Sequence, residues 1–215
     1  MAIRAHVGND NFVLTPEGNH VATCFRMIHI GRVQEEFNGN KRIVNRIRIG
    51  FELNETLRVF NEEDGEQPFV IEKEYTLSMH EQANLRKDLE SWRGKGFAED
   101  EADGFDVTVL LGKPCLVNVV HRTSKSSGRQ YAAISVITTL PRSIQPPKQV
   151  NPTFVFDYEE NFDQFDQLPD WLKKRVENSE EYFLKEQEKS VSAQNGPPKA
   201  PASAVVVNED DDTPF

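Results

Sequence analysis

The sequence contains few of the residues that disulfides, metal sites and catalytic centres require. Cys24 and Cys115 are its two cysteines, and they lie far apart within apolar runs, outside any Cys-x-x-Cys pair. We therefore expect two buried thiols in a reducing compartment and no structural zinc site. The histidines are scattered, and no His-x-x-x-His, Walker or Gly-x-Ser-x-Gly pattern occurs. These absences argue against an enzyme, and we expect neither a cofactor nor a metal.

Long apolar runs are absent as well. No stretch approaches the roughly 18 apolar residues that a membrane-spanning helix needs, and the first residues lack the apolar core of a secretion signal. We expect no membrane association and a cytoplasmic location. The 215 residues are enough for one domain with appendages.

The net charge of -10 is spread unevenly along the chain. Residues 146–215 carry 7 Lys and Arg against 15 Asp and Glu, a net of -8, whereas residues 20–145 carry 17 against 18. The body of the chain is therefore nearly neutral and can present a basic face although the whole protein is acidic.

Apolar patterning predicts a strand-rich body with one helix. An Asn38-Gly39 turn separates the first two strands. Ser78 is a candidate N-cap for the helix, which Gly94 would end. In chain order, the predicted elements are strands over residues 20–33, 41–53, 57–60 and 69–79, a helix over residues 80–92, a short helical or loop segment over residues 99–111, and strands over residues 114–121 and 130–140.

This order is typical of one small β architecture. Three strand regions, a helix and two further strands match the five-stranded Greek-key barrel called the OB-fold, whose helix lies between the third and fourth strands. We predict a mainly β protein with an OB-fold-like barrel over residues 19–145, preceded by an N-terminal arm over residues 1–18. Another small β-barrel or sandwich with one helix is the alternative.

The chain changes character after Leu140. Four prolines within residues 141–152 predict an extended linker. Residues 168–176 predict a helix with Pro169 in its first turn, and Ser179 predicts the start of a second helix. We interpret residues 146–189 as a linker and acidic helical segment, and residues 190–215 as a disordered tail.

The strand over residues 41–53 carries a binding signal. Alternation places Arg42, Arg46 and Arg48 on the face opposite to Ile43 and the isoleucines that follow it. A row of guanidinium groups suits a nucleic-acid backbone. The alternative is a solubilising face with Glu partners on neighbouring strands. Three arginines with no acid between them on that face favour binding.

Two hairpin loops add aromatic and basic residues, and in OB-folds such loops flank the binding groove. Aromatic rings stack on bases and cations neutralise phosphates. Ordinary packing at strand ends is the alternative for both loop aromatics, and Trp92 is better read as a core anchor of the helix. The candidates from the loops and the third strand region are Phe37, Lys41, Tyr75, Arg122, Lys125, Arg129 and Tyr131.

The last residues carry the most specific motif, an acidic run from Glu209 to Asp212 followed by Thr-Pro-Phe. A small basic pocket with an apolar floor can capture a terminal Phe carboxylate, and an acidic solubilising tail is the alternative. The ending resembles the Asp-Asp-Asp-Ile-Pro-Phe tip of bacterial single-stranded-DNA-binding proteins, with Thr213 in place of Ile. The body looks more like the divergent bacteriophage members of that family.

The resemblance implies a non-catalytic protein that coats single-stranded DNA with little sequence preference, in a bacterial cell or an infected bacterial host. It implies that replication, recombination or repair enzymes dock on the tip through Asp210, Asp211, Asp212, Pro214 and Phe215. The oligomeric state stays open, with a homo-oligomer among the options. The alternative function is an OB-fold adaptor that binds protein instead of DNA, with residues 153–188 as a docking helix. A nuclease or annealing factor is a third reading.

Overall fold

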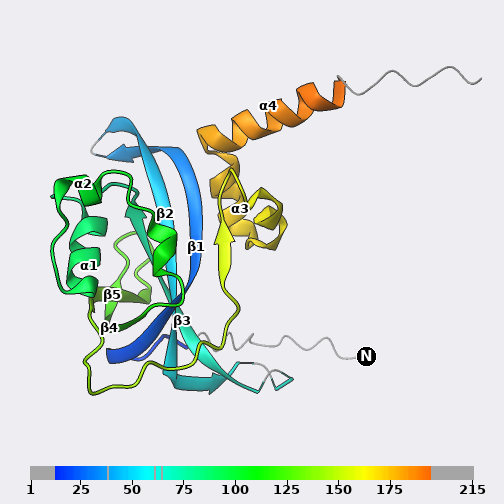
Figure 1. Ribbon diagram of the computed structural model, residues 1–215. Coiled ribbons are helices and arrows are strands. Elements are labelled where there is room, and N and C mark those ends of the chain that lie inside the picture. The colour runs from blue at the N-terminus through cyan, green and yellow to red at the C-terminus, as the bar shows by residue number, and fades with distance from the viewer. Residues whose placement is uncertain (1–12, 38, 61, 64, 195–215) are drawn as a thin grey trace, which may run out of the picture.

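The computed structural model describes residues 13–37, 39–60, 62–63 and 65–194. The protein is mainly β with a few helices (Figure 1). Two short 3-10 turns, over Val107–Leu110 and Phe162–Gln167, accompany the regular elements. These elements are β1 (Gly18–Phe37), β2 (Asn40–Val59), β3 (Glu66–Thr76), α1 (Asn84–Arg93), α2 (Glu99–Ala102), β4 (Pro114–Thr123), β5 (Gln130–Thr138), β6 (Phe154–Phe156), α3 (Asp170–Glu177) and α4 (Glu180–Gln194).

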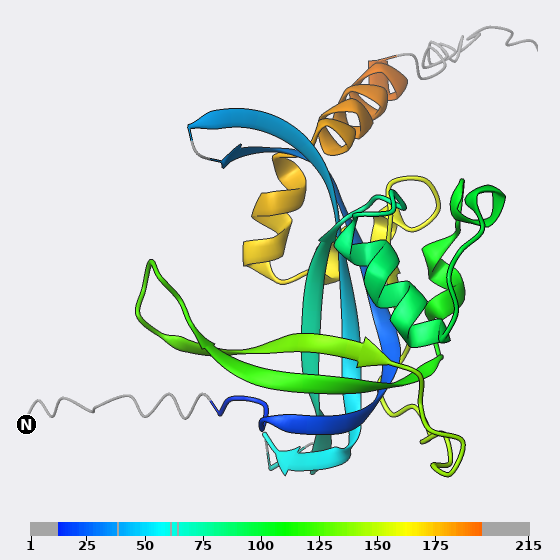
Figure 2. The ribbon, with the colours of Figure 1, turned by 90° about the vertical axis from the view of Figure 1, so that its left-hand side faces the viewer.

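The strands form one six-stranded sheet. Its order is β3-β2-β1-β4-β5, and β6 pairs separately with β1. Neighbouring strands are antiparallel, except that β6 runs parallel to β1. Within the described residues the two end strands, β3 and β5, contact each other but share no ladder, so the sheet is open. Long, curved β1 and β2 form its centre (Figure 2).

The main core lies between the sheet and α1. Ile47, Ile49 and Phe51 point into it from β2, as the alternating pattern predicts, and Trp92 enters from α1. The Trp92 indole Nε1 donates a hydrogen bond to the Pro114 carbonyl oxygen at 2.9 Å, which ties α1 to β4. The prediction that Trp92 anchors the helix is confirmed, and so is the burial of both cysteines.

Helix boundaries differ from the predicted ones for local reasons. Helix α1 begins at Asn84 with Ala83 at the N-cap, so the Ser78 N-cap prediction is wrong. The Ser78 hydroxyl instead accepts a hydrogen bond from the His80 backbone N–H in the preceding turn. Gly94 ends the helix in the left-handed conformation at φ 72°, as expected. At the other end of the chain, α4 continues to Gln194, past the predicted start of the disordered tail.

Residues 154–189, here called the C-terminal module, pack on the face of β1 that lies opposite to α1 (Figure 1). Ile28 and Ile30 of β1 form a second core with Phe156 and Leu172. The linker interpretation missed both the strand β6 and this second core. Helix α4 projects away from the sheet beyond its first turn (Figure 1).

Gly31 allows the module to approach β1. Its φ is +91°, and an added Cβ would lie 2.6 Å from the Glu181 Oε2 atom, 2.9 Å from the Ser179 Cβ and 3.0 Å from the Tyr158 hydroxyl. The Tyr158 hydroxyl donates a hydrogen bond to the Ile30 carbonyl oxygen at 2.8 Å. Both the backbone angle and the space require glycine here.

A buried carboxylate fixes the course of the linker that leads to the module. Glu52 of β2 is fully buried. Its Oε1 atom accepts hydrogen bonds from Asn54 Nδ2 at 2.6 Å and from the Val150 N–H at 2.7 Å. Its Oε2 atom accepts from the Asn151 N–H at 2.7 Å and from Asn151 Nδ2 at 2.8 Å. Four donors offset the cost of burying this side chain.

Candidate nucleic-acid interface

The arginines of β2 lie on the predicted face, but acids from neighbouring strands pair with them. Arg46 forms an ion pair with Glu35, and Arg48 forms one with Glu72. The Arg46 guanidinium holds the pKa of Glu35 below its usual value through their hydrogen bond. Both arginines are therefore largely committed within the protein. For Arg46 and Arg48 the structure shows the alternative, with Glu partners on neighbouring strands, and the prediction that they are open to solvent for binding is wrong.

The C-terminal module adds to this network. Arg175 Nη2 of α3 donates a hydrogen bond to Glu74 Oε1 at 2.8 Å, and this bond raises the pKa of Arg175. The Arg48 guanidinium carbon lies 4.8 Å from the centroid of the Trp171 ring. Helix α3 thus covers part of the arginine face, which the sequence pattern of β2 does not reveal.

The prediction that Tyr75 binds nucleic acid is also wrong. Tyr75 is only 3% exposed and belongs to the main core. Its hydroxyl donates a hydrogen bond to Asp88 Oδ2 at 2.7 Å. Burial and the nearby Asp88 carboxylate raise the pKa of Tyr75 well above its usual value. A ring held in this way is not available for stacking on a base.

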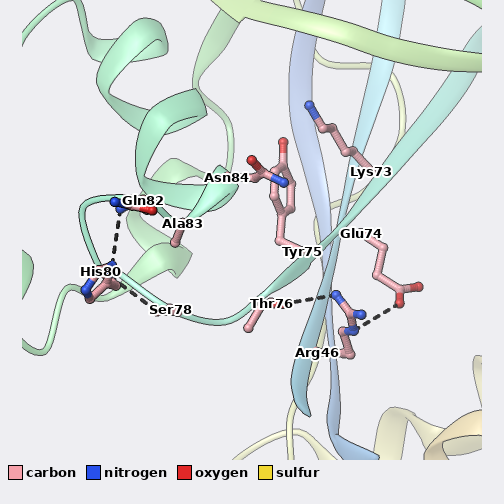
Figure 3. A pocket seen from close by; sticks show the side chains of 10 residues that line it. All are labelled: Arg46, Lys73, Glu74, Tyr75, Thr76, Ser78, His80, Gln82, Ala83 and Asn84. Carbon is pink, nitrogen blue, oxygen red and sulfur yellow. Dashed lines mark hydrogen bonds and ion pairs between the residues drawn. The ribbon is translucent and has the colours of Figure 1, made fainter. Parts of the chain in front are cut away.

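A polar hollow of about 350 Å³ opens beside Tyr75, between the end of β3 and the start of α1 (Figure 3). Its cations are Arg46 and Lys73. The Lys73 Nζ atom lies 2.6 Å from Asp88 Oδ2, and Arg46 pairs with Glu35. Because acids already neutralise both cations, this hollow is a poor candidate for binding phosphate.

A larger groove of about 660 Å³ lies at the seam between β3 and β5. Tyr131 of β5 and Trp171 of α3 line it with rings that are 43% and 49% exposed. Phe60 packs edge-on against Phe69 at its β3 side, with ring centroids 5.0 Å apart. The other residues that line the groove come from residues 13–15, from β3 over residues 67–72, and from Arg26, Arg48, Ala132, Asn151 and Pro169.

The basic hairpin between β4 and β5 leads into this groove. Arg122 is the cross-strand partner of Tyr131. Arg122, Lys125 and Arg129 are all exposed, and none of them takes part in an ion pair within the described ranges. The structure therefore places the four predicted residues of this loop together, next to an open aromatic groove.

The β1–β2 hairpin carries the remaining predicted residues. It projects toward the same side of the molecule as the β4–β5 hairpin (Figure 2). Phe37 is the last residue of β1 and pairs with Asn40, while Lys41 and Arg42 are exposed. Ile43 is also exposed, against the expectation that it shares the buried face, because it lies near the hairpin tip, where the core ends.

Several groove residues escaped the sequence analysis. Trp171 was predicted only as part of a helix, and Arg26 was not predicted as a binding residue, whereas Phe60 was considered as a stacking ring beside Tyr75 without an assigned face. The available signal was the density of aromatic residues in the acidic segment after residue 153. Trp171 reaches the groove only because β6 and the Glu52 contacts direct the chain back across β1.

The described residues contain no group of three or more His, Cys, Asp or Glu side chains that could hold a metal ion. No helix among them is long and apolar enough to cross a membrane. The predicted partner-docking residues, Asp210 to Asp212, Pro214 and Phe215, lie outside the described residues.

Comparison of the chain with protein-family models and with curated protein sequences found no match.

Proposed function

We propose that this protein binds single-stranded DNA with little sequence preference in the groove between β3 and β5. The observation that carries the proposal is the presence of Tyr131 and Trp171 in one groove, beside a hairpin whose three exposed cations form no ion pair with another described residue. Rings of this kind stack on any base, and the cations attract the phosphate backbone. The protein would act in the cytoplasm of a bacterial cell or of an infected bacterial host.

The arrangement of the sheet supports the proposal. The strand order β3-β2-β1-β4-β5, with α1 between β3 and β4, is the order expected of an OB-fold. We infer an OB-fold-like barrel with an open seam between β3 and β5. The groove lies at this seam, and the β4–β5 hairpin, which flanks the binding groove in OB-folds, supplies Tyr131 and its basic neighbours.

The test is fluorescence anisotropy with a labelled oligo-dT of about 30 nucleotides, at low and moderate salt, beside a duplex of the same length. We expect Tyr131→Ala and Trp171→Ala each to weaken binding by about 5- to 150-fold, because one stacked base contributes about 1–3 kcal/mol. Stacking should also quench the fluorescence of Trp171, while buried Trp92 keeps its emission.

Phe183→Ala is the matched control, because Phe183 is an exposed ring on α4 that does not line the groove. It should leave the affinity unchanged. Binding should weaken steeply as salt rises, since each neutralised phosphate releases counterions. Failure of the unaltered protein to bind the single strand, or equal affinities for all three variants, would contradict the proposal.

The adaptor function is the second candidate, and the exposed apolar surface of α4 favours it. Phe183 and Leu184 are 62% and 51% exposed and adjoin a shallow cavity of about 450 Å³. In this alternative, α4 binds a partner protein and the groove binds no nucleic acid. The anisotropy experiment separates the two functions, since an adaptor would show no affinity for the single strand at any salt concentration.

We also propose that the acidic tip recruits replication, recombination or repair enzymes. The support is the sequence of Asp210, Asp211, Asp212, Pro214 and Phe215 and its resemblance to the tip of single-stranded-DNA-binding proteins. An enzyme with a basic, apolar-floored pocket is the partner that such a motif fits.

A further inference from the structure

A smaller cavity of about 310 Å³ adjoins the groove and shares Arg26, Asn151 and Pro169 with it. We propose that this cavity holds one nucleobase of the bound strand, with a preference for thymine or guanine. The inference rests on the proposed function. It adds a base-selective pocket at one end of a groove that otherwise tolerates any sequence.

The walls of the cavity suit the flat faces of a base. Phe25 and Ile28 of β1 are buried, and Phe154 of β6 is half-buried. Phe154 is the register partner of Arg26, so the pairing of β6 with β1 sets the cavity beside the groove. Apolar walls with a few polar groups at fixed places are typical of small-molecule sites.

Hydrogen bonds within the protein orient the polar groups of the cavity. Arg26 Nη1 donates a hydrogen bond to Glu72 Oε1 at 3.0 Å. The other N–H groups of this guanidinium remain as donors for a ligand. Gln167 Nε2 donates to Gln164 Oε1 at 2.6 Å, and Asn151 Nδ2 donates to Glu52. Among the hydrogen bonds of the described residues, none uses the side-chain oxygen of Gln167 or of Asn151.

The residues that line the cavity therefore include one cationic donor, Arg26, and two side chains with unused acceptor oxygens. A base that carries a carbonyl oxygen next to a ring N–H can use both kinds of group. Thymine and guanine have this arrangement on the edge that pairs in a duplex, and this edge is free in a single strand. Adenine has no carbonyl oxygen, so it offers the Arg26 donor no acceptor of this kind. The preference for thymine or guanine follows from this difference.

The continuity of the two cavities favours a base over an unrelated small molecule. A strand stacked on Trp171 passes Pro169 and Arg26, which border both spaces. Its next nucleotide lies at the mouth of the smaller cavity. Arg26, which pairs with Glu72, borders this mouth, and its guanidinium lies over the Phe25 ring at 4.9 Å from the centroid.

The experiment compares labelled oligo-dT and oligo-dA of about eight nucleotides with the full chain. Gln167→Ala removes one acceptor from an exposed position. It should weaken oligo-dT binding by about 3- to 10-fold, the usual effect of one hydrogen bond, and leave oligo-dA binding unchanged. Gln187→Ala is the control, since Gln187 is an exposed glutamine on α4 that lines neither cavity. It should change neither affinity.

Photo-crosslinking gives a second readout, with 5-iodouracil placed in turn at each position of the oligo-dT. One position should crosslink to the peptide that contains Phe154 or Phe25. Crosslinks confined to the Tyr131 and Trp171 peptides, with Gln167→Ala equal to its control, would overturn the base pocket while leaving the DNA-binding function intact. Absence of any binding by the unaltered protein would instead refute the proposed function itself.

Discussion

Gly31 is the residue on which the docking of the C-terminal module depends most directly. It lies at the irregularity in β1 between His29 and Gly31, where the strand shifts register against β2. Ser179 and Tyr158 approach it closely, and the Arg32 N–H donates a hydrogen bond to Glu181 Oε2 at 2.7 Å. The start of α4 and the loop after β6 thus meet β1 at one glycine.

Replacing Gly31 with alanine should destabilise the protein by about 1–3 kcal/mol, because the residue combines a positive φ with contacts shorter than a Cβ allows. Urea denaturation measures the loss, and limited proteolysis within residues 154–189 shows whether the module loosens. Gly128→Ala is the control, since Gly128 has φ +68° but no atom within 4 Å of an added Cβ. Equal losses for both variants would mean that backbone strain alone is responsible.

At the scale of the elements, alternation identified the two faces of β2 over its middle residues but not at the hairpin tip, where Ile43 is exposed. It predicted that Ile47 and Ile49 are buried and that Arg46 and Arg48 lie on the other face of β2. It did not predict the acids that meet these arginines. Glu74 of β3 is the direct register partner of Arg48, and no single strand specifies its register with the next one.

Only the part of the candidate site that is local in sequence could be predicted. The β4–β5 hairpin is local in sequence, so Arg122 and Tyr131 could be placed together from the turn between them. The wall formed by Trp171 depends on contacts between residues about 100 positions apart, such as those of Glu52 with Val150 and Asn151. Periodicity does not encode contacts of this kind.

The acids of β3 also lead to a prediction about DNA binding. Glu72 lines the groove and pairs with both Arg26 and Arg48. Glu72→Gln should leave Arg26 without its carboxylate partner and Arg48 paired with Glu74 alone. The variant should therefore bind oligo-dT more tightly at low salt, with a steeper salt dependence. Glu159→Gln is the control for the change in net charge, because Glu159 is exposed and lines no part of the groove. If both variants tighten binding equally, only the net charge matters.

At the scale of the whole molecule, the charge is divided between a nearly neutral body and an acidic C-terminal third. Of the net charge of -10, residues 146–215 contribute -8. The body presents exposed cations on the β4–β5 hairpin. An acidic tail tethered to the same chain encounters these cations at a high effective concentration, because its attachment makes the contact intramolecular. Tail and DNA phosphates would then compete for the same cations.

Removal of Glu209–Phe215 should therefore tighten binding to oligo-dT at low salt, and the difference from the full chain should shrink as salt screens the tail. Titrations of both proteins over several salt concentrations measure this. Phe215→Ala keeps all four acids of the run and should retain the competition, while it weakens recruitment of any partner enzyme that binds the tip. Equal affinities with and without Glu209–Phe215 at every salt concentration would show that the tail does not compete with DNA for the groove. The acidic residues of the tail would then act only in binding partner proteins.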